Sequence, residues 1–207
     1  MDIDVKTAIE HGDAQAMGRL LLEDPSLANA LIRWGNGILT HPLHYVCDML
    51  FEGKLAPGKE PLLIDALIQA GADLDFQRDR EDGQKSDTPL IGAASLAAEQ
   101  VGLRLLDAGA RPELRGIFGE TALHWAALLG EDRLAERLIS GSDIDLKDEK
   151  YHSSPLGWAI HGWQNPQAGS RGKQCEVAAM LVRAGAKVES EWLESADAAM
   201  LAALRPA

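Results

Sequence analysis

Three side chains early in the chain have types and spacing that could bind a metal ion. His41, His44 and Cys47 follow one another at intervals of three residues, and Asp48 is adjacent to the last of them. Imidazole and thiolate groups are ligands that Zn²⁺ prefers. Structural roles account for the same residues, because His41 stands at a predicted helix start and Cys47 falls on an apolar helix side. We therefore predict no metal site and no cofactor.

Other patterns of catalytic residues do not occur in the sequence. There is no Ser–His–Asp arrangement, no phosphate-cradling glycine loop and no closely spaced acid pair in an apolar setting. Residues 73–75 and 143–145 read Asp-Leu-Asp and Asp-Ile-Asp, but no glycine and distal glutamate complete an EF-hand loop there. We predict that the protein is not an enzyme.

An enzyme remains an alternative in one form. The chain has two Gly- and Pro-containing insertions, residues 51–61 and 165–173. These loops would have to build a pocket around reactive side chains, for which the candidates are Cys47, His161 and Cys175.

The stretch 119–130, Gly-Glu-Thr-Ala-Leu-His-Trp-Ala-Ala-Leu-Leu-Gly, recurs imperfectly along the chain. Thr88, Thr121 and Ser154 are 33 residues apart, and each begins a similar stretch. A hydroxyl at that place can cap a helix, and apolar residues follow it at helical spacing. Such a period indicates stacked helix pairs that bury their apolar faces on their neighbours.

The repeats divide the whole chain. We predict one domain, 1–207, made of five units and a terminal cap: roughly 1–37, 38–84, 85–117, 118–150 and 151–190, with the cap at 191–204. The two insertions fall at the same place in their units, between the paired helices.

Composition narrows the partners and the compartment. The formal net charge of −12 argues against nucleic acid and against an anionic membrane, both of which attract Lys and Arg. No secretory signal or membrane-length apolar run is present, and the two cysteines lie far apart in sequence. We therefore expect a cytoplasmic protein with reduced thiols, and a monomer.

The repeated residues resemble those of the ankyrin repeat, whose core reads T-P-L-H-x-A. Glycines end the second helices at Gly71, Gly109, Gly141 and Gly185. The family histidine is kept as His44 and His124, but Ile91 and Gly157 replace it elsewhere. The cap position is occupied by Thr88, Thr121 and Ser154, with His41 as a departure, and the following leucine by Leu43, Leu90, Leu123 and Leu156.

The resemblance implies an all-α solenoid of stacked helix-turn-helix units with projecting β-hairpin fingers and a C-terminal capping helix. It also implies a concave face, lined by first helices and fingers, that usually binds another protein. The family has no reaction of its own, so function must be argued from the site.

One position on the implied concave face is rich in aromatic residues. It is occupied by Tyr45, Trp125 and Trp158 in three units, and by Thr7 and Gly92 in the others. Trp125 and Trp158 are one repeat apart, which would place them side by side. Aromatic side chains there can anchor a partner, because they bury much area at a small cost in entropy. Alternatively, the rings pack between neighbouring helices.

The fingers offer a second candidate surface. Basic side chains there could meet a carboxylate-rich partner, and aromatic side chains could be exposed anchors. The candidates are Trp34, Arg78, Arg80, Arg115, Phe118 and Tyr151. Alternatively, these are solvated turn residues whose rings fold back on the stack.

Together these features favour a protein-interaction module with one protein partner of unknown identity. A narrower alternative is a small inhibitor or immunity-type protein that covers the site of a toxin or enzyme, where an acidic charge would suit a basic target. The array could also act only as a spacer in a larger complex.

Overall fold

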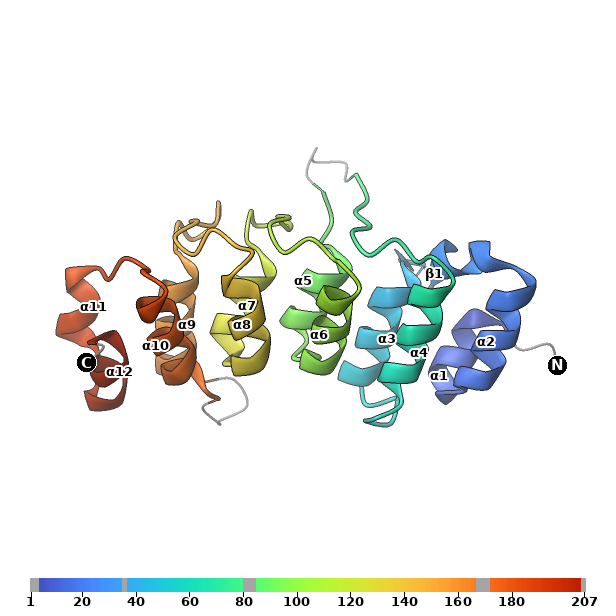
Figure 1. Ribbon diagram of the computed structural model, residues 1–207, viewed down its shortest axis with the longest axis horizontal. Coiled ribbons are helices and arrows are strands. Elements are labelled where there is room, and N and C mark those ends of the chain that lie inside the picture. The colour runs from blue at the N-terminus through green and yellow to red at the C-terminus, as the bar shows by residue number, and fades with distance from the viewer. Residues whose placement is uncertain (1–3, 35–36, 80–84, 167–171, 206–207) are drawn as a thin grey trace. The chain divides into compact units, whose positions relative to one another are not determined.

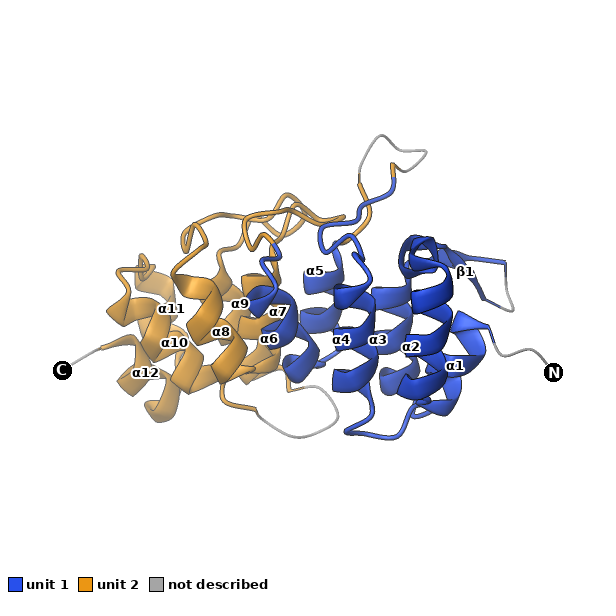
Figure 2. Ribbon diagram, turned by 45° about the vertical axis from the view of Figure 1, so that its right-hand side comes forward, with its two compact units in different colours: residues 1–78, 88–110 blue, residues 79–87, 111–207 orange. Residues whose placement is uncertain are grey.

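The computed structural model of the protein describes residues 4–34, 37–79, 85–166 and 172–205 (Figure 1). It consists almost entirely of short helices in antiparallel pairs, with irregular fingers between the pairs. The chain divides into two compact units (Figure 2). Unit 1 comprises residues 1–78 and 88–110, and unit 2 comprises residues 79–87 and 111–207.

Unit 1 contains three helix pairs and one β-hairpin. Paired helices contact each other, and α2 and α4 pack side by side, as do α4 and α6. The elements are α1 (Val5–His11), α2 (Ala14–Glu23), the 3-10 helix η1 (Pro25–Asn29), β1 (Ile32–Arg33), β2 (Leu39–Thr40), α3 (Pro42–Phe51), α4 (Glu60–Gln69), α5 (Pro89–Ser95) and α6 (Glu99–Asp107).

The helices of unit 1 begin where the sequence supplies a cap. Thr88 Oγ accepts a hydrogen bond from the backbone N–H of Ile91 (3.2 Å) at the start of α5. His41, which departs from the expected Thr or Ser, has the same role, because its Nδ1 accepts from the N–H of Leu43 (3.3 Å). Its ring is 1% exposed and stacks on Phe76 with a centroid distance of 4.7 Å. An imidazole therefore replaces the hydroxyl cap of α3.

Strands β1 and β2 form a short antiparallel hairpin in which Ile32 pairs with Thr40 and Arg33 with Leu39. This is the hairpin that Gly and Asn residues between them predict. In unit 2, Asp79 and Lys85 form an isolated antiparallel bridge in the next finger.

Unit 2 contains the second half of the array. The elements are α7 (Ala122–Leu129), α8 (Asp132–Ile139), α9 (Pro155–Gln164), α10 (Gln174–Arg183), α11 (Ser190–Ser195) and α12 (Ala198–Leu204). The core between the pairs is fully buried and aliphatic, with Leu123, Ala126, Leu134, Leu138, Leu156, Val177 and Leu181 all at 0% exposure.

The first helices α7 and α9 approach each other especially closely. A Cβ atom at Gly162 would overlap the backbone carbonyl of Leu128, so only glycine allows α9 to lie this near to α7. This approach sets the separation of the side chains that the two helices present on their common face.

The terminal segment forms two helices, where a single capping helix is expected. The first ends at Ser195, and Asp197 caps the second, since its Oδ1 accepts from the N–H of Met200 (3.0 Å). Met200 and Leu204 are buried, and α12 packs against α10. The cap is therefore a shortened helix pair that covers the last full pair, α9 and α10.

The helices, their pairing and the repeat period confirm the predicted all-α repeat solenoid. That the whole chain forms one domain stays a prediction, since the chain divides into two compact units.

Candidate functional site

Two tryptophans at equivalent places in α7 and α9 meet on their common face. The rings of Trp125 and Trp158 pack edge to face, with centroids 5.1 Å apart and planes at 83°. Trp125 Nε1–H donates to Glu120 Oε1, and Trp158 Nε1–H donates to Asp148 Oδ2, both at 3.0 Å. Each ring is therefore fixed by its packing and by a carboxylate from the adjoining finger.

Finger residues extend this cluster. Tyr151 lies 5.9 Å from Trp158 in an edge-to-face arrangement and 6.5 Å from Phe118, measured between ring centroids. The Nζ of Lys150 sits above both finger rings, 4.0 Å from the Phe118 centroid and 5.0 Å from that of Tyr151. Four aromatic rings from two helices and two fingers thus form one cluster, which we call the aromatic cluster: Phe118, Trp125, Tyr151 and Trp158.

Asp148 organises the finger beneath the cluster. Its carboxylate accepts from the backbone N–H groups of Lys150 (2.9 Å), Tyr151 (2.6 Å) and Ser153 (3.1 Å), besides the Trp158 indole. Burial raises the pKa of Asp148, but the hydrogen bonds from Tyr151, Trp158, Ser153 and Lys150 outweigh it and bring the pKa below its ordinary value. A buried, ionised carboxylate therefore lies at the N–H edge of the Trp158 ring. Trp158 is itself only 5% exposed, so its ring packs in the stack and the expectation of an open ring face there is wrong.

His124 supports the cluster from inside the stack. Its Nδ1 accepts from the N–H of Thr121 (3.1 Å), its Nε2 lies 3.1 Å from the carbonyl oxygen of Leu146, and its ring packs against Trp158. Burial lowers the pKa of His124 to about 4, so the imidazole is neutral at physiological pH. The family histidine thus joins the start of α7 to the next finger.

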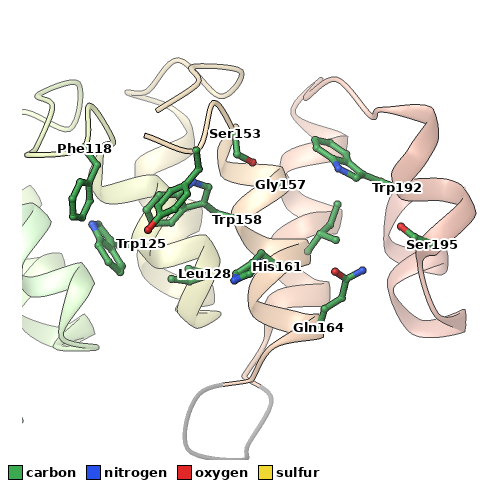
Figure 3. A pocket seen from close by; sticks show the side chains of 12 residues that line it. Phe118, Trp125, Leu128, Ser153, Gly157, Trp158, His161, Gln164, Trp192 and Ser195 are labelled. Atoms are coloured by element: carbon green, nitrogen blue, oxygen red, sulfur yellow. The ribbon is translucent and has the colours of Figure 1, made fainter. Parts of the chain in front are cut away.

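The aromatic cluster forms one side of a groove of about 550 Å³ (Figure 3). Trp192 of α11 stands at the opposite end from Phe118 and Trp125, and Leu128 and His161 lie between them in that view (Figure 3). The remaining lining residues are Ser153, Gly157, Ile160, Gln164 and Ser195. This volume suits several side chains of a short peptide segment.

Gly157 gives the Trp192 ring its place. A Cβ atom at Gly157 would overlap Ser153 Oγ and would also lie 3.2 Å from Trp192 Cζ2, tighter than ordinary contact, so glycine accommodates both side chains. Gly157 occupies the position of the family histidine, so its departure from the family pattern makes room for a ring of the terminal cap.

The predicted site residues of unit 1 lie elsewhere. Tyr45 is 2% exposed, and its hydroxyl donates to Glu10 Oε1 (2.6 Å), so the expectation of an open ring face at Tyr45 is wrong. Desolvation and the nearby Glu10 raise the pKa of Tyr45, which keeps the hydroxyl protonated. Trp34 packs edge to face on Tyr45 at 5.4 Å and has Lys54 Nζ 5.8 Å from its ring centroid. The rings of Trp34 and Tyr45 therefore pack on the helix stack, which is the alternative that the sequence also allows.

The structure describes Arg78 and Arg115 of the predicted finger arginines. Arg115 is tied to its own fingers, because its Nε–H donates to the carbonyl of Gly119 (2.8 Å) and its Nη2 lies 3.5 Å from Glu149 Oε1. Arg78 is exposed and belongs to unit 1. Arg80 lies outside the described residues.

The residues considered for metal or covalent chemistry have structural surroundings of their own. His41 caps α3, Cys47 donates to the carbonyl of Leu43, Cys175 is on α10, and His161 is exposed at the groove. Burial lowers the pKa of His41 to about 4. Within the described ranges, no group of three or more His, Cys, Asp or Glu side chains is arranged to hold a metal ion.

Sequence reasoning identified the four rings of the cluster but not the far end of the groove. The sequence places Trp192 in the cap and gives no signal for Leu128 or Ile160, and it offers His161 only as a candidate reactive side chain. Gly157 is the sequence feature that could have indicated this end of the groove, because a glycine in place of the family histidine leaves room for a bulky ring.

The comparisons with known proteins agree with this architecture. The family model described as "Ankyrin repeats (3 copies)" matches residues 55–148, and a search of curated proteins finds no match. Repeats of this family are generally protein–protein interaction modules and typically have no catalytic activity. None of the helices in the described part of the chain has the length and apolar character needed to cross a bilayer. Residues 55–148 are therefore similar to ankyrin repeats, and helix pairs continue on either side of this matched region.

Proposed function

We propose that this protein is a non-enzymatic interaction module that binds a short segment of a partner protein in the groove of unit 2. The observation that carries the proposal is the groove itself, with rings of the aromatic cluster along one side and Trp192 at its end. Trp125 and Phe118 are half-buried and Tyr151 is 59% exposed, so a ligand would remove substantial apolar area from water.

The rings are already fixed before any partner arrives. Trp125 and Trp158 each donate to a buried carboxylate, and they pack against each other. Binding at fixed rings avoids much of the entropy cost of ordering side chains. Anchors of this kind, Trp and Tyr above all, commonly contribute most of the binding energy of an interface.

We also propose that the protein acts as a monomer in the cytoplasm, because its sequence shows no secretory signal and its two cysteines lie far apart. Cys47 and Cys175 are thiols and form no disulfide, in agreement with a reducing compartment.

Selection from a random library of displayed twelve-residue peptides tests the groove. The wild type should enrich a family of related peptides, and Trp125→Leu should bind those peptides at least about tenfold more weakly because it removes one ring face. The matched control is Trp163→Leu. Trp163 also donates to a carboxylate, Asp197 Oδ2 (2.9 Å), but it does not line the groove.

Circular dichroism melts of both variants establish that the fold is retained. Equal binding of the enriched peptides by the wild type and Trp125→Leu would show that the groove is not the binding site. Loss of binding in both folded variants would contradict the proposal in the same way.

A further inference from the structure

Trp125 and Trp158, two of the three tryptophans that line the groove, have no indole N–H left for a ligand. Each indole has a single N–H, and those of Trp125 and Trp158 point to Glu120 and Asp148. Aromatic grooves that bind extended proline-rich peptides use such donors for peptide carbonyl groups. Here the rings can offer a ligand only their edges and faces, which favours apolar or cationic side chains.

A buried carboxyl group lies at the N–H edge of each ring. Glu120 is 0% exposed and Asp148 is 1% exposed, and hydrogen bonds from each indole end on their carboxylate oxygens. Donation to a carboxylate polarises an indole and increases the electron density of its π system. The quadrupole of an aromatic ring attracts a cation to its face, and an anion hydrogen-bonded at the edge of the ring adds to that attraction.

The same cluster already holds a cation of the protein itself. The Lys150 ammonium lies over Phe118 and Tyr151, within the range at which cation–π attraction operates. The Lys150 side chain is exposed, so it holds this place while in contact with water. The cluster therefore attracts a cation even where solvent competes.

Charges at the other end of the groove have the complementary sign for a basic ligand. Glu191 and Glu194 are exposed on α11, the short helix that supplies Trp192 and Ser195 to the groove. The protein as a whole has a formal net charge of −12. A basic segment is thus attracted at long range as well as in the groove.

We propose that the groove recognises a basic side chain, arginine or lysine, of the bound segment, with its cation against the half-buried ring of Trp125, and that Lys150 competes for the same aromatic cluster. This inference rests on the proposed function, because it names the chemistry of the segment that the groove binds. Arginine fits best, since a planar guanidinium stacks on aromatic faces and is more weakly hydrated than an ammonium.

Two small probes of nearly identical shape test the inference. N-acetyl-arginine amide has a charged guanidinium, whereas N-acetyl-citrulline amide has a neutral urea group in its place. Titration followed by the indole N–H signals in ¹⁵N-labelled protein reports the rings separately. The arginine probe should shift the signals of Trp125 and Trp158 saturably and bind about tenfold more tightly than the citrulline probe. The Trp163 signal should not move.

Two variants and a lysine probe sharpen the test. Lys150→Met removes the competing ammonium while keeping the side-chain length, so the arginine probe should bind several-fold more tightly. Trp125→Leu should weaken it by about tenfold, and Trp125→Phe, which keeps an aromatic face, should weaken it less. Nα-acetyl-lysine amide, whose side chain keeps its charged ammonium, compares the two cations. We expect it to bind more weakly than the arginine probe.

Equal binding of the arginine and citrulline probes, or no saturable shift with the arginine probe, would overturn the inference. Peptides that bind in a Trp125-dependent way but show no preference for basic residues would also overturn it, and the proposed function would stand. Peptides that ignore Trp125 would instead refute the proposed function.

Discussion

His124 is a buried neutral imidazole whose hydrogen bonds join α7 to the following finger. The unfolded chain takes up a proton at this residue near pH 6.5, whereas the folded protein resists it until pH falls to about 4. Folding is therefore favoured less as pH drops through this window, because only the unfolded state gains the proton.

His124→Gln should remove this part of the pH dependence. Glutamine at the third helical position can still accept from the Thr121 N–H, as in a capping box. Between pH 7.5 and pH 5, the wild type should lose about 2 kcal/mol more of unfolding free energy than the variant. Urea denaturation at both pH values measures the difference. Parallel losses in the two proteins would mean that His124 does not titrate on unfolding.

Residues in the same repeat register can have different roles, and the sequence does not distinguish them. Tyr45, Trp125 and Trp158 share one position, but Tyr45 is fully packed whereas Trp125 lines the groove. The Tyr45 hydroxyl donates to Glu10 on α1, the first helix of the preceding pair, while the Trp125 indole donates to a carboxylate in its own finger. The repeat predicts the position of each ring, and partners outside the motif decide its exposure.

At the scale of elements, the turn between paired helices shows one strained residue. Ala97, between α5 and α6, has a φ of 55°, a left-handed conformation that glycine adopts readily. The residue 33 positions later is Gly130, with a φ of 72°. Alanine therefore stands where the neighbouring repeat has glycine.

Ala97→Gly should stabilise the protein by roughly 0.5–1 kcal/mol, because relief of the left-handed strain exceeds the extra entropy of glycine in the unfolded chain. The reciprocal change, Gly130→Ala, should destabilise it by more than about 1 kcal/mol, since the new Cβ atom would also approach the backbone nitrogen of Lys173. Thermal and urea unfolding of both variants measure these effects. A lower melting temperature for Ala97→Gly would contradict the strain at this turn.

The helices were predictable from sequence because their signals are local. Caps at Thr88 and Ser154, apolar spacing and the period of 33 residues all lie within one repeat. The division of the terminal cap into α11 and α12 was missed, because Asp197 reads equally well as a solvated position within one amphipathic helix. The groove was missed as a cavity, since it depends on how a ring from α11 meets a glycine on α9.

For the whole molecule, the net charge of −12 predicts how binding responds to salt. If the groove takes a basic segment, its association rate constant should fall by about tenfold between 20 and 500 mM NaCl, because screening removes the long-range attraction. Stopped-flow tryptophan fluorescence with an arginine-containing library peptide measures this rate. Its citrulline-substituted counterpart is the control and should show little salt dependence. If the association rate constants of both peptides depended equally on salt, electrostatic attraction of the arginine side chain to the protein would be excluded.

Trp192 belongs to α11, the helix that follows the last full pair, and it reaches Gly157 on α9. The end of the groove is therefore set by the number of repeats. An engineer who lengthened the array by inserting a consensus repeat after α10 would move Trp192 away from Gly157 and replace it with a repeat surface. Such an extended protein should gain stability and lose the groove. In this protein, the number of repeats therefore determines whether the groove forms.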